Sequence, residues 1–190
     1  MKKTYLFQRI AVFVDYANIN RSASDFGIKL DYADLLDYLT AGRHLVEAIA
    51  YVPIDPSLPH GRDAECEELW QARYFVKTKL GKRAGDTYKC NVDVEMTIDM
   101  LNAALDMDID TVVLVSGDGD FVPVVAYLRG RGIRVEACGF QANTAHELML
   151  KSSGYIDMEA YLEERFGEEP TPEYGPEDEG QDIPVRSHLG

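Results

Sequence analysis

The amino-acid sequence predicts an α/β fold in which a mostly parallel sheet is covered by helices. Apolar runs alternate along the chain with segments of helical periodicity, as is typical of parallel sheets with covering helices. The runs are nearly continuous, as expected for strands buried on both faces. Two of them, residues 10–14 and 111–115, lead into aspartates, Asp15 and Asp118. Because ligands bind outside the carboxyl ends of such strands, the sequence predicts a site at that edge.

The first half of the chain is predicted to contain two strands and two helices. In chain order we expect a strand at 10–14, a helix at 31–39, a strand at 45–52, a loop at 53–63, a helix at 64–80 and a polar connection at 81–91. Asp31 is suited to cap the first helix, and Gly42 is suited to end it. Pro53 closes the second strand, and further prolines predict the loop. Apolar side chains at helical spacing extend the second helix as far as Gly81.

The second half of the chain continues the alternation. We expect a helix at 93–105, a strand at 111–115, a helix at 121–128, a strand at 133–138, a helix at 142–151 and a last helix at 156–166. Pro123 falls in the first turn of its helix, where proline is tolerated. Residues 167–190 are rich in proline, glycine and glutamate and are expected to be disordered. The predicted organisation is therefore one domain at 1–166 and an acidic tail at 167–190.

Composition excludes several classes of protein. The formal net charge is −14, and −6 of it falls in the tail, where seven acids face Arg186 alone. General electrostatic binding to nucleic acid needs an excess of Lys and Arg, so any RNA contact is expected to be local or bridged by metal. Cys66, Cys90 and Cys138 form no C-x-x-C pair, which argues against a zinc ribbon or a disulfide framework. Without a membrane-length apolar stretch or a secretory leader pattern, we expect a cytoplasmic protein with no membrane partner.

Five aspartates occupy positions that are typical of a cation site. These candidate catalytic residues are Asp15, Asp93, Asp99, Asp118 and Asp120. Asp15 ends the first strand, Asp93 stands at a predicted helix start, and Asp118 and Asp120 share a glycine-rich turn after a later strand. Hard cations such as Mg²⁺ and Mn²⁺ prefer oxygen ligands. Ions held in this way support phosphodiester cleavage without a serine, cysteine or histidine nucleophile.

Each of these acids, taken alone, also has an ordinary structural explanation. Asp15 and Asp118 fit turn positions, and Asp93 and Asp120 fit helix caps. Asp99 lies six residues after Asp93, which at about 100° per residue places it well off that helix face, so a solvated face is its alternative. The joint placement of the acids at strand and helix ends favours a metal site over several unrelated structural roles.

The same residues resemble the LabA-like branch of the NYN domain family, a group related to the PIN nucleases. The matching pieces are Val12-Phe13-Val14-Asp15-Tyr16-Ala17-Asn18-Ile19, Lys89-Cys90-Asn91-Val92-Asp93-Val94 with Asp99, Val115-Ser116-Gly117-Asp118-Gly119-Asp120-Phe121, and Gly132-Ile133-Arg134-Val135. The resemblance covers residues 10–155, nearly the whole predicted domain. One departure is visible: the family often has Lys-Gly-Val-Asp, whereas two residues, Cys90 and Asn91, separate Lys89 from Val92 here.

The resemblance implies a PIN-like, Rossmann-like three-layer α/β/α sandwich with a Mg²⁺ or Mn²⁺ site and ribonuclease activity. By position, it makes Asp15, Asp93 and Asp118 the metal ligands. It makes Asp99 and Asp120 supporting acids. It also implies that the side chains that orient ligands or phosphate are those of Asn18 and Ser116.

One stretch of the sequence is rich in basic residues and is the candidate RNA-binding surface. It contains Lys77, Lys79, Lys82, Arg83 and Lys89. Aromatic side chains lie near it in sequence, and a positive strip with aromatics is a common way of holding single-stranded nucleic acid. The alternative is a solvated helix end, where basic residues complement the helix dipole.

Two classes of function are consistent with these features of the sequence. The first is a cytoplasmic metal-dependent ribonuclease that acts on RNA, single-stranded in the simplest case. The second is a non-catalytic regulatory or RNA-binding module that keeps the acids as a relic or as a structural metal site. A homo-oligomer is compatible with both, since the apolar residues 148–150 are suited to cover either the sheet or a partner.

Overall fold

A central parallel sheet organises the protein. The computed structural model describes residues 8–85 and 87–167, and in these ranges six strands form one sheet in the order β3-β2-β1-β6-β7-β8. Their bounds are β1 (Arg9–Asp15), β2 (His44–Ile54), β3 (Phe75–Leu80), β6 (Thr111–Val115), β7 (Arg134–Gly139) and β8 (Gly154–Asp157). All five strand pairings are parallel. The carboxyl ends of β1 and β6, which are neighbours, therefore meet at one edge.

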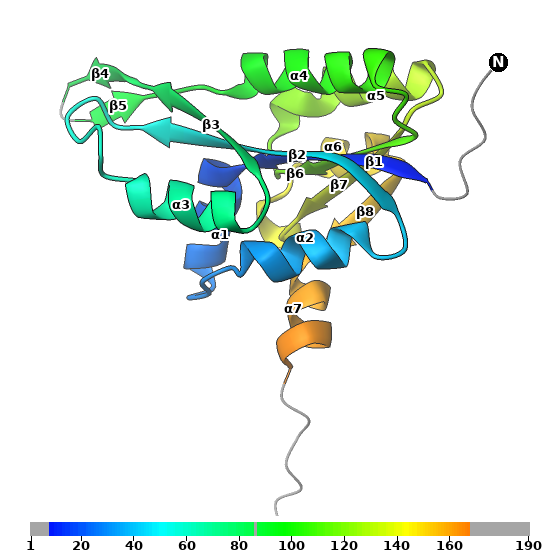
Figure 1. Ribbon diagram of the computed structural model, residues 1–190, viewed down its shortest axis with the longest axis horizontal. Helices are drawn as coiled ribbons and strands as arrows, with labels where there is room; N and C mark the ends of the chain where they lie inside the picture. Colours follow the sequence, from blue (N-terminus) through cyan, green and yellow to red (C-terminus); the bar gives the residue numbers. More distant parts are fainter. Residues whose placement is uncertain (1–7, 86, 168–190) are drawn as a thin grey trace, which may run out of the picture.

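Helices cover both faces of this sheet (Figure 1). On one face lie α1 (Tyr16–Asp25), α2 (Tyr32–Thr40), α3 (Asp63–Gln71) and α7 (Met158–Phe166), and on the other lie α4 (Asp93–Asp106), α5 (Val122–Gly130) and α6 (His146–Lys151). Successive residues of β1 point to opposite faces: Val12 packs in the first core, and Phe13 in the second. Both side chains are fully buried. The predicted three-layer α/β/α sandwich is confirmed.

The predicted helix at 64–80 is wrong in its second half. Helix α3 ends at Gln71, and residues 75–80 form the edge strand β3, which pairs with β2 from Ile49↔Phe75 to Ile54↔Leu80. The chain turns at Arg73, whose φ of 71° is left-handed. The amide of Tyr74 donates to the carbonyl of Leu69, and the amide of Arg73 to that of Trp70, which is the Schellman pattern. Because arginine occupies the position that glycine usually takes, the sequence carries no visible stop signal.

The predicted polar connection at 81–91 contains a small hairpin. Strands β4 (Lys82–Ala84) and β5 (Thr87–Lys89) pair antiparallel, with Lys82 opposite Lys89. The hairpin starts at Gly81, where a Cβ atom would overlap the ring of Tyr88. Only glycine therefore lets the end of β3 pass so close to β5.

The remaining differences concern short elements. Helix α1 and strand β8 are absent from the predicted set, and the expected helix at 142–151 is a 3₁₀ turn followed by the shorter helix α6. In that helix Leu148 is buried, whereas Leu150 is 66% exposed. Among residues 8–85 and 87–167, none of the helices combines the length and apolarity needed to cross a bilayer. Apart from Gly167, the predicted acidic tail lies outside the described residues.

Candidate metal centre

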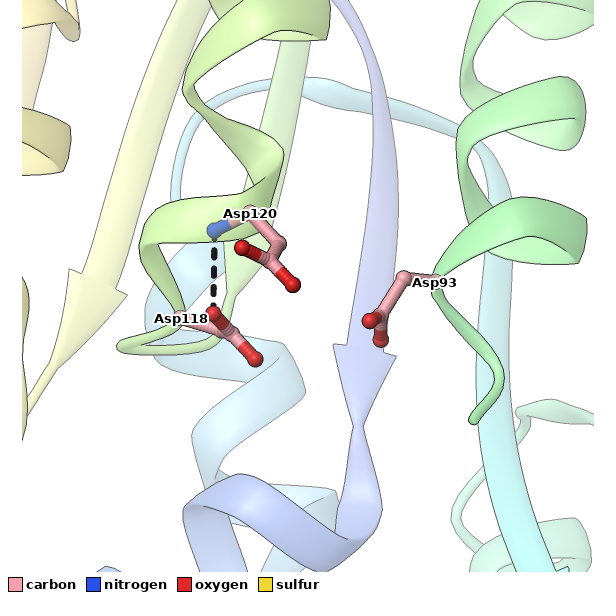
Figure 2. A group of neighbouring side chains, drawn as sticks. All are labelled: Asp93, Asp118 and Asp120. Carbon is pink, nitrogen blue, oxygen red and sulfur yellow. Dashed lines mark hydrogen bonds between the residues drawn. The ribbon is translucent and has the colours of Figure 1, made fainter. Parts of the chain in front are cut away.

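Three carboxylates converge at the carboxyl edge of the sheet. In the part of the chain that the structure describes, Asp93, Asp118 and Asp120 each offer one oxygen, and these oxygens all lie within 4.8 Å of one another. Asp93 begins α4, while Asp118 and Asp120 lie in the turn that follows β6 (Figure 2). Asp93 and Asp118 are half-buried, and Asp120 is exposed. The fold therefore brings three of the five predicted acids together.

Local hydrogen bonds shape the turn after β6. The carboxylate of Asp118 accepts from the backbone amide of Asp120 over 2.9 Å, and this bond caps the 3₁₀ turn η1 (Gly119–Phe121) (Figure 2). Gly117 packs so closely on the segment before α6 that a Cβ atom would overlap the carbonyl oxygen of Asn143. The carbonyl of Gly117 also accepts from the amide of Ala145 over 2.8 Å. The glycine therefore fixes the turn that presents both carboxylates.

Asp15 lies buried beside this cluster, at the end of β1. It is 5% exposed, and its carboxylate accepts from the backbone amide of Asn18 and from the hydroxyl of Ser116, both over 3.2 Å. The pKa of Asp15 is raised from 3.8 to about 6, mainly by burial and in addition by the nearby charges of Asp93 and Asp118, while the two hydrogen bonds oppose the rise. Within the described ranges, the group whose oxygens lie within 4.8 Å of one another does not include Asp15.

Asn18 and Ser116 tie the turn after β6 to the end of β1. The side-chain carbonyl of Asn18 accepts from the amide of Gly117 over 2.9 Å. The hydroxyl of Ser116 donates to Asp15 and accepts from the amide of Asp118 over 3.2 Å. Asn18 and Ser116, which were predicted to orient ligands or phosphate, therefore hold the acid-bearing segments in place in this fold.

Sequence reasoning missed the partner of Asp93. The side-chain amide of Asn91 donates to the carboxylate of Asp93 over 2.7 Å, and its carbonyl accepts from the amide of Asp93 over 2.9 Å. Burial raises the pKa of the Asp93 carboxyl, as do the charges of Asp118 and Asp120, although the bond from Asn91 opposes them. The departure from the family pattern at this position was the one available signal.

Asp99 lies apart from the three converging acids. One of its carboxylate oxygens accepts from the hydroxyl of Tyr51 over 2.5 Å and from the Lys77 ammonium over 2.6 Å. Burial raises the pKa of the Tyr51 hydroxyl, and the bond to Asp99 adds to this effect. Asp99 thus links α4 to β2 and β3.

The five predicted RNA-binding residues divide into two groups. Lys77 and Lys79 lie on β3 and face α4, where Lys79 bonds the carbonyl of Asn91 over 2.7 Å and the carboxylate of Glu95 over 2.5 Å. The other three, which lie on the hairpin and are exposed, are Lys82, Arg83 and Lys89. Lys79 is therefore held beside Asp93 at the start of α4, whereas Lys77 is held farther along that helix, at Asp99.

The donor set fits a hard divalent cation. The converging groups are carboxylates, the ligand type that Mg²⁺ and Mn²⁺ take, usually with water completing the shell. Repulsion among clustered acids also raises the pKa of Asp93, and a bound cation would remove that repulsion. The arrangement is therefore suited to hold a divalent cation at the carboxyl edge of the sheet.

Comparisons with known proteins agree with this architecture. Residues 9–159 match the family described as the NYN domain. The low amplitude and bright protein LabA from Synechococcus elongatus is 33% identical over 162 residues, which cover 79% of this chain and 83% of that protein. A crystal structure of a protein of unknown function from Vibrio parahaemolyticus has a TM-score of 0.71 at 26% identity, covering 82% of this chain and 96% of the other.

The match to the family spans most of the chain, and it includes the segments that carry all five predicted acids. The relative from Synechococcus is aligned over most of both chains, so the similarity extends to the whole domain. NYN domains are PIN-like, are generally nucleases that bind RNA, and typically use divalent metals. The chain, with its parallel sheet and its acids at the carboxyl edge, belongs to the NYN domain family, among the LabA-like proteins.

Proposed function

We propose that this protein is a metal-dependent ribonuclease that hydrolyses phosphodiester bonds of RNA. The observation that carries the proposal is the convergence of the carboxylate oxygens of Asp93, Asp118 and Asp120 within 4.8 Å, at the carboxyl edge of a parallel sheet. The burial of Asp15 next to them adds a fourth acid, which has its pKa raised to about 6. Four acids placed together in this way are costly for a protein without a cation.

In this proposal Asp15, Asp93 and Asp118 hold a Mg²⁺ or Mn²⁺ ion, and Asp120 orients the attacking water. When bound, the ion supplies charge stabilisation for the phosphate and a more acidic water. Hydrolysis forms a bond from the water oxygen to phosphorus and breaks the bond to one ester oxygen. The water proton passes to the exposed carboxylate of Asp120, and the leaving oxygen takes a proton from solvent.

Asp99 has a supporting role in this proposal, through Lys77. Its carboxylate holds the Lys77 ammonium at 2.6 Å, in the layer between β3 and α4. The exposed residues Lys82 and Lys89, paired across the hairpin, extend positive charge away from the acids. An RNA strand that follows these side chains reaches the metal centre from the β3 edge, and single-stranded RNA fits best because its backbone bends freely.

The proposal is tested by cleavage of 5′- and 3′-labelled RNAs, single-stranded and structured, with Mn²⁺, Mg²⁺ or chelator. Asp118→Asn keeps the oxygen that accepts from the amide of Asp120 but removes one charge from the cluster. Asp106→Asn makes the same change at the other end of α4 and is the matched control. We expect metal-dependent products from the wild type and from Asp106→Asn only. Cleavage that survives in Asp118→Asn contradicts the assignment.

A non-catalytic regulatory or RNA-binding module is the second candidate. It is favoured by the structural role that Asp15 already has, since its carboxylate caps α1 and bonds Ser116. Such an acid persists in a fold whether or not it holds a metal ion. A thermal shift with Mn²⁺, together with RNA binding but without any cleavage, would support this function over the ribonuclease.

We propose a cytoplasmic location for either function. Cys66, Cys90 and Cys138, all within the described residues, are unpaired. Free thiols of this kind are maintained in reducing compartments. Fractionation of cells that express the full chain tests this location directly.

A further inference from the structure

Helix α4 carries a second apolar face that points to solvent. Its core face contains Met96 and Met100, which are fully buried. The opposite side carries Val94, Ile98 and Leu105, and between the last two lies Leu101, which is partly buried and packs against the core. Val94 is 64% exposed, Ile98 51% and Leu105 47%. Helices of a two-faced domain usually turn charged side chains outward, so this exposed stripe is unusual for a covering helix.

The first two residues of this stripe line a cleft that opens beside the acids. The cleft has a volume of about 400 Å³ and is lined by Asn91, Asp93, Val94, Thr97, Ile98 and Asp120. Two of the lining residues, Asp93 and Asp120, also belong to the candidate metal centre. The lining therefore combines two acidic side chains shared with that centre and two apolar side chains of α4.

The lining restricts what the cleft can bind. Of its six described residues, none carries a positive charge and two are acids, so an anionic group is disfavoured unless a cation lies between. The apolar wall of Val94 and Ile98 favours a flat, uncharged group, and Thr97 and Asn91 supply a hydroxyl and an amide at its margin. The volume falls at the lower end of the range for small-molecule sites, roughly 300 to 1,000 Å³.

We propose that this cleft binds a nucleobase: that of the nucleotide next to the phosphate held at the metal centre. The inference deepens the proposed ribonuclease and rests on it for the position of the phosphate. A base is uncharged and flat, and it is linked through its sugar to that phosphate, as the cleft shares Asp93 and Asp120 with the metal centre. Val94 and Ile98 are then base-binding residues, which contact the base and not the reacting atoms.

The binding of a base is tested without any RNA cleavage, by methyl NMR on the full chain. Uridine and adenosine, which carry no phosphate, are the probes. We expect the methyl resonances of Val94 and Ile98 to shift with nucleoside concentration, while those of Leu105, farther along the stripe, stay in place. Unmoved methyl resonances at Val94 and Ile98 overturn the proposal.

A pair of variants tests the role of the cleft in RNA binding. Ile98→Asp places a carboxylate on the apolar wall, and Leu105→Asp, the matched control, makes the same change away from the cleft. We expect Ile98→Asp to weaken the binding of a short single-stranded RNA about tenfold. We expect Leu105→Asp to leave the affinity unchanged. A thermal shift with Mn²⁺ that matches the wild type in both variants confirms that the metal centre is intact.

An oligonucleotide with one abasic position separates contact with a base from charge repulsion. The wild type is expected to bind it more weakly than the intact strand, and Ile98→Asp is expected to lose this discrimination. Equal binding of both strands by the wild type overturns the inference. So do methyl shifts along the whole stripe that follow protein concentration, since these would mean that a second copy of the chain covers α4.

The two proposals fail in different ways. A wild type that cleaves no RNA, while nucleoside still moves the Val94 and Ile98 resonances, contradicts the ribonuclease and supports the base site. If the wild type cleaves RNA but nucleoside does not shift the Val94 and Ile98 resonances, the base site is contradicted and the ribonuclease is supported.

Discussion

The hydroxyl of Ser116 donates to the buried carboxylate of Asp15 across 3.2 Å, although the two residues are 101 positions apart in the sequence. The same hydroxyl accepts from the amide of Asp118. Ser116 is fully buried, so solvent does not replace either bond. One side chain therefore connects the acid at the end of β1 with the acid in the turn after β6.

Ser116→Ala is expected to destabilise the fold and to weaken metal binding. The substitution leaves a buried carboxylate and a backbone amide each short of one partner, at a cost of about 2 kcal/mol. Urea unfolding and the thermal shift with Mn²⁺ measure the two effects. Ser24→Ala removes an exposed hydroxyl that bonds its own helix, and it is expected to change neither quantity. If Ser116→Ala and Ser24→Ala changed the stability and the Mn²⁺ response equally, the proposed role of Ser116 in the site would be contradicted.

Asp15→Asn is expected to stabilise the protein in chelator at neutral pH. Because burial raises the pKa of Asp15 in the fold from 3.8 to about 6, the stability that its protonation provides is full below pH 3.8. It is lost as pH rises through about 6, and the loss amounts to about 3 kcal/mol. The asparagine keeps an acceptor for the amide of Asn18 and carries no charge.

The free energy of unfolding, measured between pH 4 and 8 in chelator, tests whether ionisation of Asp15 destabilises the fold. The wild type should lose stability relative to Asp15→Asn as pH rises through about 6. Added Mn²⁺ should stabilise the wild type and leave the variant unchanged, because the ion favours the ionised carboxylate. A variant that is less stable than the wild type in chelator at pH 7.5 would show that the charge of Asp15 does not destabilise the fold.

Asp99→Asn separates a positioning role from metal binding. Asp99 holds Lys77 and Tyr51, and it lies outside the converging group, so the variant is expected to respond to Mn²⁺ like the wild type. RNA affinity should fall severalfold, because the Lys77 ammonium loses its ionic partner and its fixed position. Lys77→Met should reduce RNA affinity by a similar factor. The double variant, Asp99→Asn with Lys77→Met, should reduce it by no more than either single variant. If Asp99→Asn no longer responded to Mn²⁺, Asp99 would be a metal ligand and not a positioning residue.

Arg73→Gly is expected to stabilise the end of α3. The left-handed conformation at Arg73 costs an L-residue about 1 kcal/mol, and glycine avoids that cost. The lost ion pair with Asp37 matters little, because both side chains are more than half exposed. Arg73→Ala loses the same pair but keeps the strain, so it should be less stable than Arg73→Gly by urea unfolding. The reverse order would contradict the backbone argument.

The sequence was sufficient to predict which acids lie at the edge of the sheet and how the fold is layered. Asp15 and Asp118 were predictable as neighbours because both follow apolar runs, and parallel strands bring such ends together. The prediction that Asp93 joins them depended on recognising that a helix begins at the same edge of the sheet. The pairing of Asn91 with Asp93 required knowing the conformation of the turn before α4, which no periodicity reveals.

The error at 64–80 explains what was missed at Asp99. In a helix, Lys77 and Lys79 would lie about 200° apart, on different faces. In the strand β3 they share a face, and both contact α4. The bond from Tyr51 to Asp99 further depends on how β2 lies under α4, and this relation arises only from tertiary packing.

The position of β1 between β2 and β6 determines when the metal centre can first exist during synthesis. β1 pairs with residues 44–51 on one side and with residues 111–115 on the other. A chain released only as far as residue 110 has Asp15 but neither Ser116 nor Asp118. Such late, distant pairing makes assembly slow relative to local helix formation. A metal ion held as proposed by Asp15, Asp93 and Asp118 would therefore bind only after the two halves of the sheet have joined.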